Sequence, residues 1–498
     1  MHRALGIVEV VEMICEELGP EPGLSSRKRH ARRSDLARLA RASSTFLNPA
    51  LNVLWRHQGT ILNLLKCMPS DVWDFTVSKL DEDDTSDEED DILSLVAVLQ
   101  RLPTRADFDR CLFYCHRVKS FDADEEHFLE PSHVTSSGAP CADPHSFHFV
   151  RLFIAARITQ IRITCDYSDE DLSETFQMLS SRCSNLKNVG FYGQPAPGLS
   201  EFVCSLHGLE RLGASGLDPT ALSHLARLPT LHSLSLGCNP PIIFFPPSSD
   251  RCIPFPALKF LTYRSIELAP RLFEFLIKCS LVELTIFDPA VSTQAIARQF
   301  YSALATHCSH SSLEKITVMK GYGKISKSQR DMYLIGGEIL RPLFAFTNLV
   351  DVSLSHPVGV DLDDIVVREM ACAWPRIKFL ALSPERSHRI HPRVTLQGIY
   401  AFAQHCPRLC VLHLAFDATV VPKIRVKAKE RACQRSLHEI NVAHSPIRKS
   451  SSVAKFLSEI FPELDTITTL HSQIMEWRFD AKLATFDEIW SKVEQWLW

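Results

Sequence analysis

The fold class that the sequence predicts is α/β: a solenoid, or horseshoe, of stacked strand–helix repeats that follows a small all-α module. Three observations predict it. A short apolar pattern recurs through most of the 498 residues, segments with helical periodicity separate its copies, and residues 1–57 show helical periodicity without that pattern.

The recurring pattern has apolar residues at its first, fourth and sixth positions, as in LHSLSL (231–236). Copies begin at residues 158, 186, 209, 231, 258, 281, 313, 349, 377, 409 and 437, so successive starts lie 22 to 36 residues apart. Weaker copies begin at 118 and 464. The fourth and sixth residues share one face of a short strand, which cannot bury that face alone. Stacking such units creates a continuous core.

Helical periodicity fills the intervals, as in ALSHLARLP (221–229), IYAFAQHCP (399–407) and VAKFLSEIFP (453–462). A strand and a helix at this spacing form the leucine-rich repeat, whose usual length is about 20–29 residues. We therefore expect an irregular, long-unit leucine-rich-repeat horseshoe over residues 118–470. A doubly wound α/β sheet would need far more parallel strands than such domains use, and we reject it.

Residues 1–57 contain two amphipathic segments, IVEVVEMICEEL (7–18) and DLARLARASSTFLNPALNVLWRH (35–57). Asp35 suits an N-cap, and Pro49 suits the first turn of a third helix. The apolar positions at helical spacing are Val11, Ile14, Leu18, Leu36, Leu39, Phe46, Leu54 and Trp55. Three short helices bury little apolar surface by themselves, so we expect an apolar partner groove.

These segments resemble an F-box, the helical module that docks on the Skp-type adaptor of a cullin ubiquitin ligase. Similarity to the linker of F-box-like proteins of mushroom-forming (basidiomycete) fungi is found in LLKCMPSDVWDF (64–75) and LPTRADFDRCLFYCHRVKSF (102–121). The segment HCPRLCVLHL (405–414) is similar to the repeats of F-box proteins. The resemblance implies an adaptor site at Val11, Ile14, Leu18, Leu36, Leu39, Phe46, Leu54 and Trp55. Gly6 and Ile7 stand where an F-box usually has Leu-Pro, and residues 19–34 form a polar insert. The alternative is that residues 1–57 only cap the repeats.

The resemblance also implies a function. The chain would be the substrate-recognition subunit of a Skp–cullin–F-box ubiquitin ligase, with the adaptor, and through it a cullin, on the F-box and a protein substrate on the repeats. The alternative is a leucine-rich-repeat scaffold without ligase association. GYGK (321–324) lacks the full Walker spacing, and GxSxG and HExxH are absent, so we expect no enzyme and no catalytic residue. An enzyme with a scattered active site would need a pocket that gathers His, Cys or Asp side chains.

Composition limits the partners and the location. A net charge of -4 gives no attraction to nucleic acid or anionic membranes, and no apolar run reaches the roughly 20 residues of a membrane helix. The N-terminus lacks a secretory signal, so we expect a cytoplasmic or nuclear protein. Cys183, Cys279 and Cys406 each lie just before a repeat copy, which favours buried, reduced thiols. We expect no metal and no cofactor.

Several segments stand apart from the repeats. RKRHARR (27–33) is either a nuclear localisation signal or a solvated loop, and KIRVKAKER (423–431) is expected to be a basic solvated loop. DEDDTSDEEDD (81–91) predicts a disordered insert within a linker over 58–117. PPIIFFPPSSD (240–250) either folds back over the repeats or contacts a partner. FDEIWSKVEQWLW (486–498) predicts a helix within a C-terminal cap over 471–498.

The repeats themselves predict a substrate site. The residues on either side of the fourth position of each copy point to the exposed face of the sheet, and most are small or polar. Phe260, Phe379 and Val411 break this pattern, as does Phe287 one step further along its strand. Rigid aromatic side chains are favoured in protein interfaces. We predict a substrate face over residues 258–416 with these four residues in it; the alternative is that inserts such as 319–348 cover them.

Overall fold

The chain forms two compact units, Met1–Thr230 and Leu231–Trp498. The computed structural model describes residues 7–20, 26–58, 62–79, 93–101, 103–123, 158–165, 171–193, 195–237, 254–274, 276, 279–288, 292–320, 325, 327–356, 358–382, 391–423, 432–469 and 481–497. The predictions for residues 81–91, 240–250 and 321–324, and for all of 423–431 except Lys423, lie outside the described residues.

Three helices open the first unit: α1 (Val8–Glu17), α2 (Ser26–Ala42) and α3 (Ser44–Trp55). The start of α3 is capped by Ser43, whose Oγ accepts a hydrogen bond from the backbone N–H of Thr45 at 3.3 Å. An ion pair between Arg56, just after α3, and Glu16 on α1 links two of the helices. The three helices pack around one apolar cluster, which supplies the stability that none of them has alone.

Two sequence expectations for these helices are wrong. Asp35 lies inside α2 rather than at its N-cap, because α2 begins at Ser26 and takes in the basic run. Arginine, lysine and alanine all favour helix, and a helix leaves the charged groups of the basic residues in water. Arg32 also donates a hydrogen bond to the carbonyl oxygen of Gly19 at 2.7 Å. Pro49 lies in the interior of α3 rather than in its first turn.

The segment that follows α3 contains short elements that the sequence did not predict. They are β1 (His57–Gln58), α4 (Leu62–Leu65), β2 (Trp73–Lys79), β3 (Leu93–Leu99), η2 (Arg105–Phe108) and α5 (Asp109–Cys115). β2 and β3 form an antiparallel pair with Trp73 opposite Leu99 and Lys79 opposite Leu93. In the sequence, the acidic run at 81–91 falls between these two strands.

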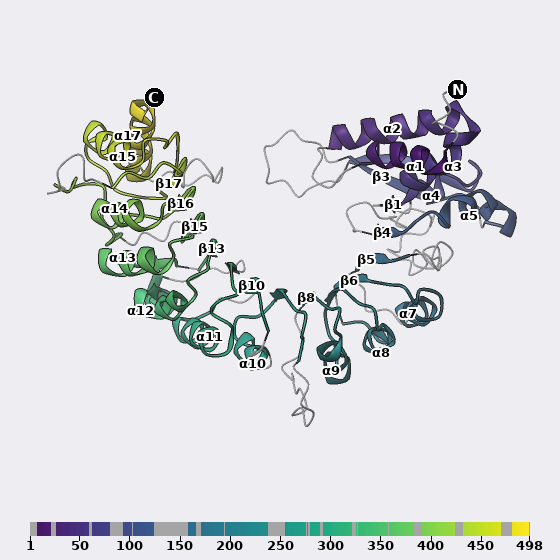
Figure 1. Cartoon of the computed structure of the whole chain (residues 1–498), viewed down its shortest axis with the longest axis horizontal. Coiled ribbons are helices and arrows are strands. Elements are labelled where there is room, and N and C mark those ends of the chain that lie inside the picture. The colour runs from purple at the N-terminus through teal and green to yellow at the C-terminus, as the bar shows by residue number, and fades with distance from the viewer. Residues whose placement is uncertain are drawn as a thin grey trace, which may run out of the picture. The chain divides into compact units, whose positions relative to one another are not determined.

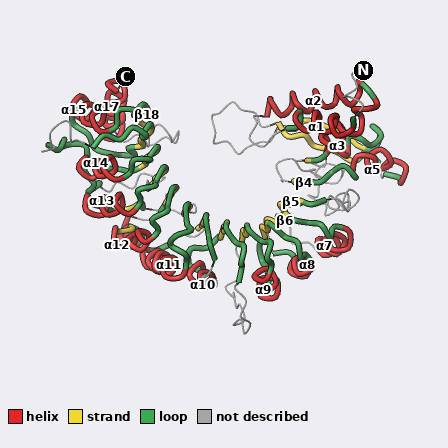
Figure 2. The backbone as a smooth tube through the Cα atoms, in the orientation of Figure 1, coloured by secondary structure: helices red, strands yellow, loops and turns green. Residues whose placement is uncertain are grey.

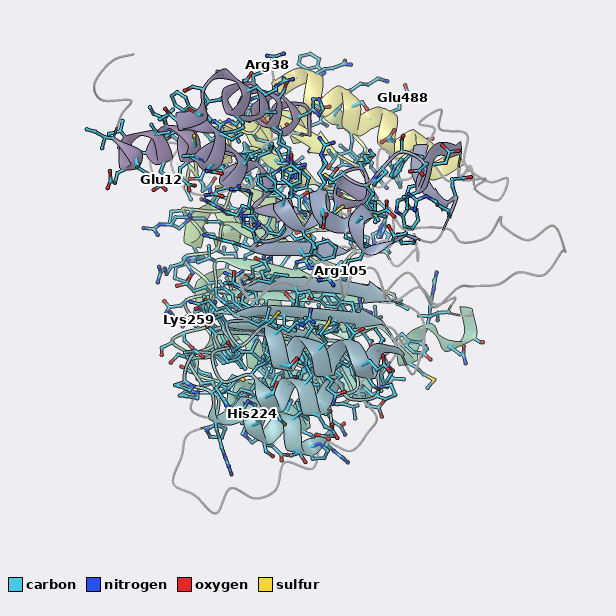
Figure 3. The ribbon with its side chains drawn as sticks, turned by 90° about the vertical axis from the view of Figure 1, so that its right-hand side faces the viewer. Glu12, Arg38, Arg105, His224, Lys259 and Glu488 are labelled. Atoms are coloured by element: carbon cyan, nitrogen blue, oxygen red, sulfur yellow. The ribbon has the colours of Figure 1, made fainter. Side chains whose placement is uncertain are left out.

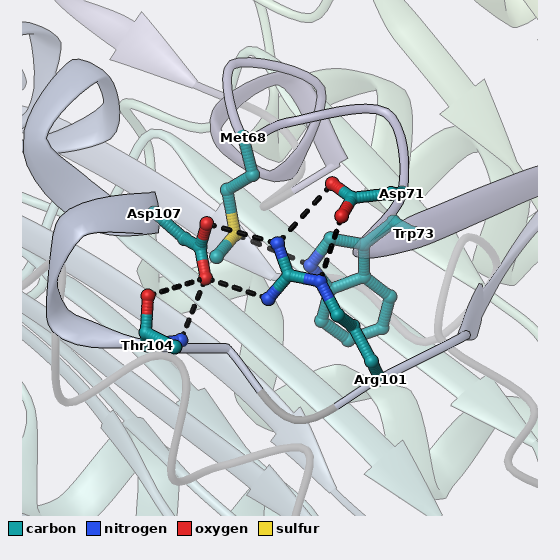
Figure 4. Close-up of polar contacts among 6 residues, drawn as sticks. All are labelled: Met68, Asp71, Trp73, Arg101, Thr104 and Asp107. Atoms are coloured by element: carbon teal, nitrogen blue, oxygen red, sulfur yellow. Dashed lines mark hydrogen bonds and ion pairs between the residues drawn. The ribbon is translucent and has the colours of Figure 1, made fainter.

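Arg101 joins the two sides of this hairpin at its base (Figure 4). Its guanidinium donates to the Asp71 carboxylate at 2.8 and 3.2 Å and to the Asp107 carboxylate at 2.8 and 3.0 Å. Asp107 also accepts from the backbone N–H and the hydroxyl of Thr104. The guanidinium of Arg101 is the main reason that the pKa of Asp107 lies well below its usual range.

Parallel strands form the rest of the first unit. Their order is β1, β4 (Ser120–Ala123), β5 (Gln160–Cys165), β6 (Asn188–Gly193) and β7 (Arg211–Ala214). The register places His57 beside Ser120, Ser120 beside Gln160 and Gln160 beside Asn188. Helices α7 (Asp171–Arg182), α8 (Leu199–Ser205) and α9 (Pro219–Arg227) alternate with the last strands. β1 was not predicted, and it places the first parallel strand directly after α3.

The second unit continues the same alternation. Its parallel strands follow the order β8 (Ser233–Leu236), β9 (Phe260–Tyr263), β10 (Glu283–Asp288), β11 (Lys315–Lys320), β13 (Asp351–Leu354), β15 (Phe379–Ala381), β16 (Val411–His413), β17 (Glu439–Asn441) and β18 (Thr466–Thr468). Their helices are α10 (Ala269–Phe273), α11 (Gln294–His307), α13 (Asp364–Ala373), α14 (Leu396–His405) and α15 (Ser450–Ile460). Short elements lie beside them: η4 (Lys327–Met332), β12 (Ile335–Gly336), α12 (Gly337–Leu340), η5 (Arg341–Ala345) and β14 (Val360–Asp361).

Every predicted repeat copy forms a parallel strand, which confirms the α/β class and the stacked repeat architecture. In the second unit α10 to α14 lie along one face of the strands (Figures 1 and 2). The fourth and sixth positions of each copy point toward these helices, so Leu234, Leu284 and Leu380 are at most 1% exposed. This apolar layer is the core of the unit.

Cysteines before the repeat copies pack into that core, as predicted. The thiol of Cys279 donates to the carbonyl oxygens of Pro254 and Phe255 at 3.4 Å, and that of Cys406 to Ala371 at 3.5 Å. Burial raises the pKa of Cys279 to about 11 and that of Cys406 to about 12, which keeps both thiols protonated.

The last described helix, α17 (Ala481–Leu497), packs against α15 and β18. Trp490 and Val493 are buried on the predicted apolar face, whereas Phe486 and Ile489 are half-buried. The indole N–H of Trp490 donates to the carbonyl oxygen of Ser445 at 2.9 Å. Among the helices described, none combines the length and the apolar character needed to cross a membrane.

Candidate binding surfaces

The helical module of residues 8–55 places the eight predicted adaptor residues mostly toward its own interior. Val11, Leu36 and Phe46 belong to the buried cluster, and Phe46 is only 9% exposed. Around that cluster pack four half-buried residues, Leu18, Leu39, Leu54 and Trp55; Ile14 is also half-buried. An adaptor site at Leu39, Phe46, Leu54 and Trp55 predicts that these residues are partly exposed. That prediction is wrong for Phe46, whereas Leu39, Leu54 and Trp55 are partly exposed.

The exposed apolar side chains of this module are different residues. On and just before α1, Ile7 is 49% exposed, Val8 60% and Met13 59%. Leu47 on α3 and Leu112 and Phe113 on α5 are also exposed. Helical apolar periodicity does not reveal these residues, because it identifies the face that packs inside a module. The signal that could have found them is an apolar residue outside that periodic stripe. Figure 3 shows the charged side chains Glu12 and Arg38 on α1 and α2.

Contacts with the following segment hold the C-terminal half of α3 in place. The Trp55 ring stacks on Tyr114 of α5. Arg117 donates to the side-chain oxygens of Asn48 and Asn52 on α3, and its guanidinium lies 5.1 Å from the centre of the Phe113 ring. Trp55 is therefore part of the internal packing of the first unit rather than a free aromatic anchor.

The second candidate surface is the exposed sheet face of the second unit, which lies opposite α10–α14 (Figure 2). The strand register places Phe260 beside Glu283, then Lys315, Asp351, Phe379, Val411 and Glu439 in one continuous row. Phe260 is 38% exposed, and Phe379 and Val411 are half-buried. Three of the four predicted substrate residues thus share one row across the sheet.

Phe287 lies further along β10, in register with Met319 of β11. Phe287 is half-buried and Met319 is 40% exposed. The guanidinium of Arg264 lies 5.9 Å from the centre of the Phe287 ring. Between this pair and the first row runs a line of small residues that includes Thr262, Thr285, Thr317, Ser353 and Ala381. The predicted residues therefore lie on one face, and none of the four is buried beneath an insert.

Charged residues lie in the same row as the aromatic ones. Lys315 forms an ion pair with Glu283 at 3.1 Å, and His413, two positions along from Val411, lies 3.4 Å from Glu439. Burial raises the pKa of Asp351, although Lys315 acts in the opposite direction. The face therefore offers apolar contact and fixed charge together, which suits a polypeptide partner better than a small apolar ligand.

A small pocket lies beyond the ends of β15 and β16. The residues that line it are Val358, Gly359, Val360, Asp361, Leu362, Leu382, Pro392, Arg393, Val394, Leu414, Ala415 and His444. Within it, Arg393 forms an ion pair with Asp361 at 2.8 Å. Within the described part of the chain, no group of three or more His, Cys, Asp or Glu side chains is arranged to hold a metal ion.

Comparisons with known proteins find only partial similarity to solved structures. No family model matches the chain, and no curated protein matches it. A solved structure of the Toll–Spatzle complex of Drosophila is similar over 68% of this chain and 46% of its own, with 11% identity and a TM-score of 0.30. The crystal structure of the Rad7 and Elc1 complex in yeast is similar over 64% of this chain and 78% of its own, with 14% identity and a TM-score of 0.30. This chain thus spans about half the length of the chain it matches in the Toll–Spatzle complex.

Proposed function

We propose that this chain is a leucine-rich-repeat protein with an N-terminal F-box and that it serves as the substrate-recognition subunit of a Skp–cullin–F-box ubiquitin ligase. The Skp-type adaptor, and through it the cullin, binds the helical module of residues 8–55. A protein substrate binds the exposed sheet face of the second unit. The chain acts in the cytoplasm or the nucleus and performs no covalent chemistry.

The observation that carries the proposal is the exposed apolar surface of α1. Ile7, Val8 and Met13 are each about half exposed or more, although the module has a complete core of its own. Exposed apolar side chains gathered on one short helix are typical of a protein-binding surface. Gly6 and Ile7 replace the usual Leu-Pro of an F-box, and the apolar side chain that this departure leaves exposed is Ile7.

The mechanism is positional. Holding the substrate and the ligase on one chain raises the effective concentration of the substrate lysine near the catalytic partner. This requires two binding surfaces that work independently; the division of the chain into two compact units supports this proposal.

Co-purification with a recombinant Skp-type adaptor tests the proposal. The full chain should retain the adaptor, and the double substitution Val8→Glu and Met13→Glu should abolish retention, because two charges would be placed in an apolar contact. Met332→Glu is the matched control, since Met332 of the second unit is 56% exposed and Met13 is 59% exposed. This control variant should retain the adaptor.

Two results contradict the proposal. If the unmodified chain does not retain the adaptor, the protein is not the ligase subunit proposed here, and a repeat scaffold without ligase association replaces it. If the double variant retains the adaptor as well as Met332→Glu does, the α1 surface is not the docking site.

A further inference from the structure

Four residues on neighbouring strands of the second unit form a patch with acidic ends and an apolar centre. The register places Asp351 of β13 beside Phe379 of β15, Phe379 beside Val411 of β16, and Val411 beside Glu439 of β17. All four side chains are half-buried on the exposed sheet face. We call these residues the acidic–apolar patch.

Neither carboxylate of the patch is neutralised by a permanent charge of its own. Lys315, the nearest cation to Asp351 in the row, forms its ion pair with Glu283 at 3.1 Å. Across the residues that the structure describes, the Asp351 carboxylate has no hydrogen bond and no ion pair. Burial disfavours its charged form, and the charge of Lys315 beside it in the row offsets this effect only in part. Glu439 lies 3.4 Å from His413, which offsets its charge only when the imidazole is protonated.

The apolar centre of the patch, Phe379 and Val411, is only half-buried. The Phe379 ring meets the His413 ring at 5.4 Å between centroids, with planes inclined at 65°. Next to Phe379 along β15 stands Ala381, whereas the matching position on β13 is Ser353 and on β11 is Thr317. A methyl group there leaves more space above the sheet than a hydroxyl side chain does, and it offers an apolar surface.

We propose that the acidic–apolar patch binds the recognition segment of the substrate, and that this segment carries an apolar residue flanked by two basic residues. The inference rests on the proposed function, because it takes the exposed sheet face as the substrate face. The apolar residue lies on Phe379 and Val411, one basic group contacts Asp351, and the other contacts Glu439.

The strand spacing sets the spacing of the basic residues. Neighbouring strands lie about 4.8 Å apart, so the three steps from β13 to β17 place Asp351 and Glu439 about 14 Å apart. An extended segment advances about 3.3 Å per residue, so basic residues about four positions apart match this distance. The recognition segment therefore has the form basic–x–apolar–x–basic, in which x is any residue.

Peptide binding to the full chain tests the inference. The probe is a fluorescein-labelled peptide with the central sequence Lys-Ser-Leu-Ser-Lys, compared with Glu-Ser-Leu-Ser-Glu and with Lys-Lys-Ser-Leu-Ser by fluorescence anisotropy. We expect the first peptide to bind roughly tenfold more tightly than either of the others, which corresponds to about 1.4 kcal/mol. The affinity should fall as salt is raised, because the contacts are charge pairs at a partly exposed surface.

Substitutions identify the groups responsible. Asp351→Asn and Glu439→Gln should each weaken the binding of the first peptide several-fold. The double variant should no longer bind the first peptide more tightly than the acidic peptide. Asp351→Asn should leave the melting temperature unchanged or raise it, because burial already disfavours the carboxylate charge. Glu314→Gln is the matched control: Glu314 is exposed just before β11 and should not affect binding.

Several results overturn the inference. The inference is wrong if the basic and acidic peptides bind equally tightly. It is also wrong if the Asp351→Asn and Glu439→Gln double variant binds the first peptide as tightly as the original chain does. Tenfold tighter peptide binding after deletion of residues 424–431 would identify that basic segment as the occupant of the patch. Dimerisation that Asp351→Asn abolishes would identify a second copy of the chain. Adaptor retention is measured on the same samples, so that failure of this inference is distinguished from failure of the proposed function.

Discussion

Trp55 and Tyr114 stack face to face, with ring centroids 4.3 Å apart and planes inclined at 20°. Trp55 ends α3 and Tyr114 belongs to α5, so the contact joins the helical module to the segment that leads into the parallel strands. The aromatic residue that the sequence marks as a docking anchor therefore stabilises the first unit from within. Its effect on adaptor binding has to be separated from its effect on stability.

Replacing Trp55 by Ala should lower the free energy of unfolding of the first unit by roughly 2 kcal/mol, because a large, half-buried ring is removed. Tyr114→Ala should lower it as well. The double variant should lose less than the sum of the two by about 0.5–1.5 kcal/mol, which is the usual energy of an aromatic pair. Urea denaturation of the full chain measures all three, and Trp55→Phe is the control that keeps a ring. Strictly additive losses would show that the stacking contributes nothing.

Phe260, Phe287 and Phe379 should matter for binding and not for folding. Changing all three to Ser is expected to leave the melting temperature within a few degrees of the original, because these rings lie on the exposed sheet face and surface changes typically alter stability little. Substrate capture should fall. Leu261→Ser is the contrasting variant, because Leu261 neighbours Phe260 but is 1% exposed, and its loss should unfold the second unit. Capture at unchanged affinity by the triple variant would remove these residues from the substrate site.

His356 should make the second unit sensitive to acid. It is 3% exposed and hydrogen-bonded to the Tyr301 hydroxyl at 2.8 Å, and burial lowers its pKa from 6.5 to about 4. The unfolded chain therefore binds a proton that the folded chain excludes. The stability that His356 contributes is complete above pH 6.5 and is lost as the pH falls toward about 4, by up to roughly 3 kcal/mol.

Urea denaturation at several pH values checks this. The double variant Tyr301→Phe and His356→Phe removes both hydrogen-bonding partners together, so it avoids leaving either one unsatisfied. The free energy of unfolding of this variant should no longer change with pH between 6.5 and 4 as it does in the original chain. An identical pH profile in the variant and the original chain would mean that His356 does not titrate in this range.

Asp288 should make the second unit less stable as the pH rises, which is the opposite of the effect of His356. It ends β10, is 6% exposed, and burial raises its pKa from 3.8 to about 6 although Ser292 hydrogen-bonds to it. A raised carboxyl pKa contributes stability that is complete below pH 3.8 and is lost as the pH rises through about 6. Asp288→Asn should therefore be more stable than the original chain at pH 8, by roughly 1–3 kcal/mol, and nearly equal to it at pH 4. A loss of stability at pH 8 would show that the charged form is the favoured one.

The repeat architecture follows from the amino-acid sequence alone. Each copy such as LHSLSL places two apolar residues on one face of a strand, and the strand must stack on its neighbours to bury them, so the period of the pattern defines both the strand and its place in the order. The exposed positions follow from the same alternation. For this reason Phe260, Phe287, Phe379 and Val411 could be assigned to one face before the structure was known.

Which apolar residues of the N-terminal module face inward depends on how its helices pack in three dimensions. Periodicity gives a helix one apolar stripe but does not say whether that stripe meets a partner or the module's own helices. Phe46 packs in the internal cluster and Met13 points outward because α1, α2 and α3 meet along that stripe. The sequence also did not predict the pairing of β2 with β3 or the register of Asp351 with Phe379. Pairing between strands depends on contacts between residues that are distant in the chain.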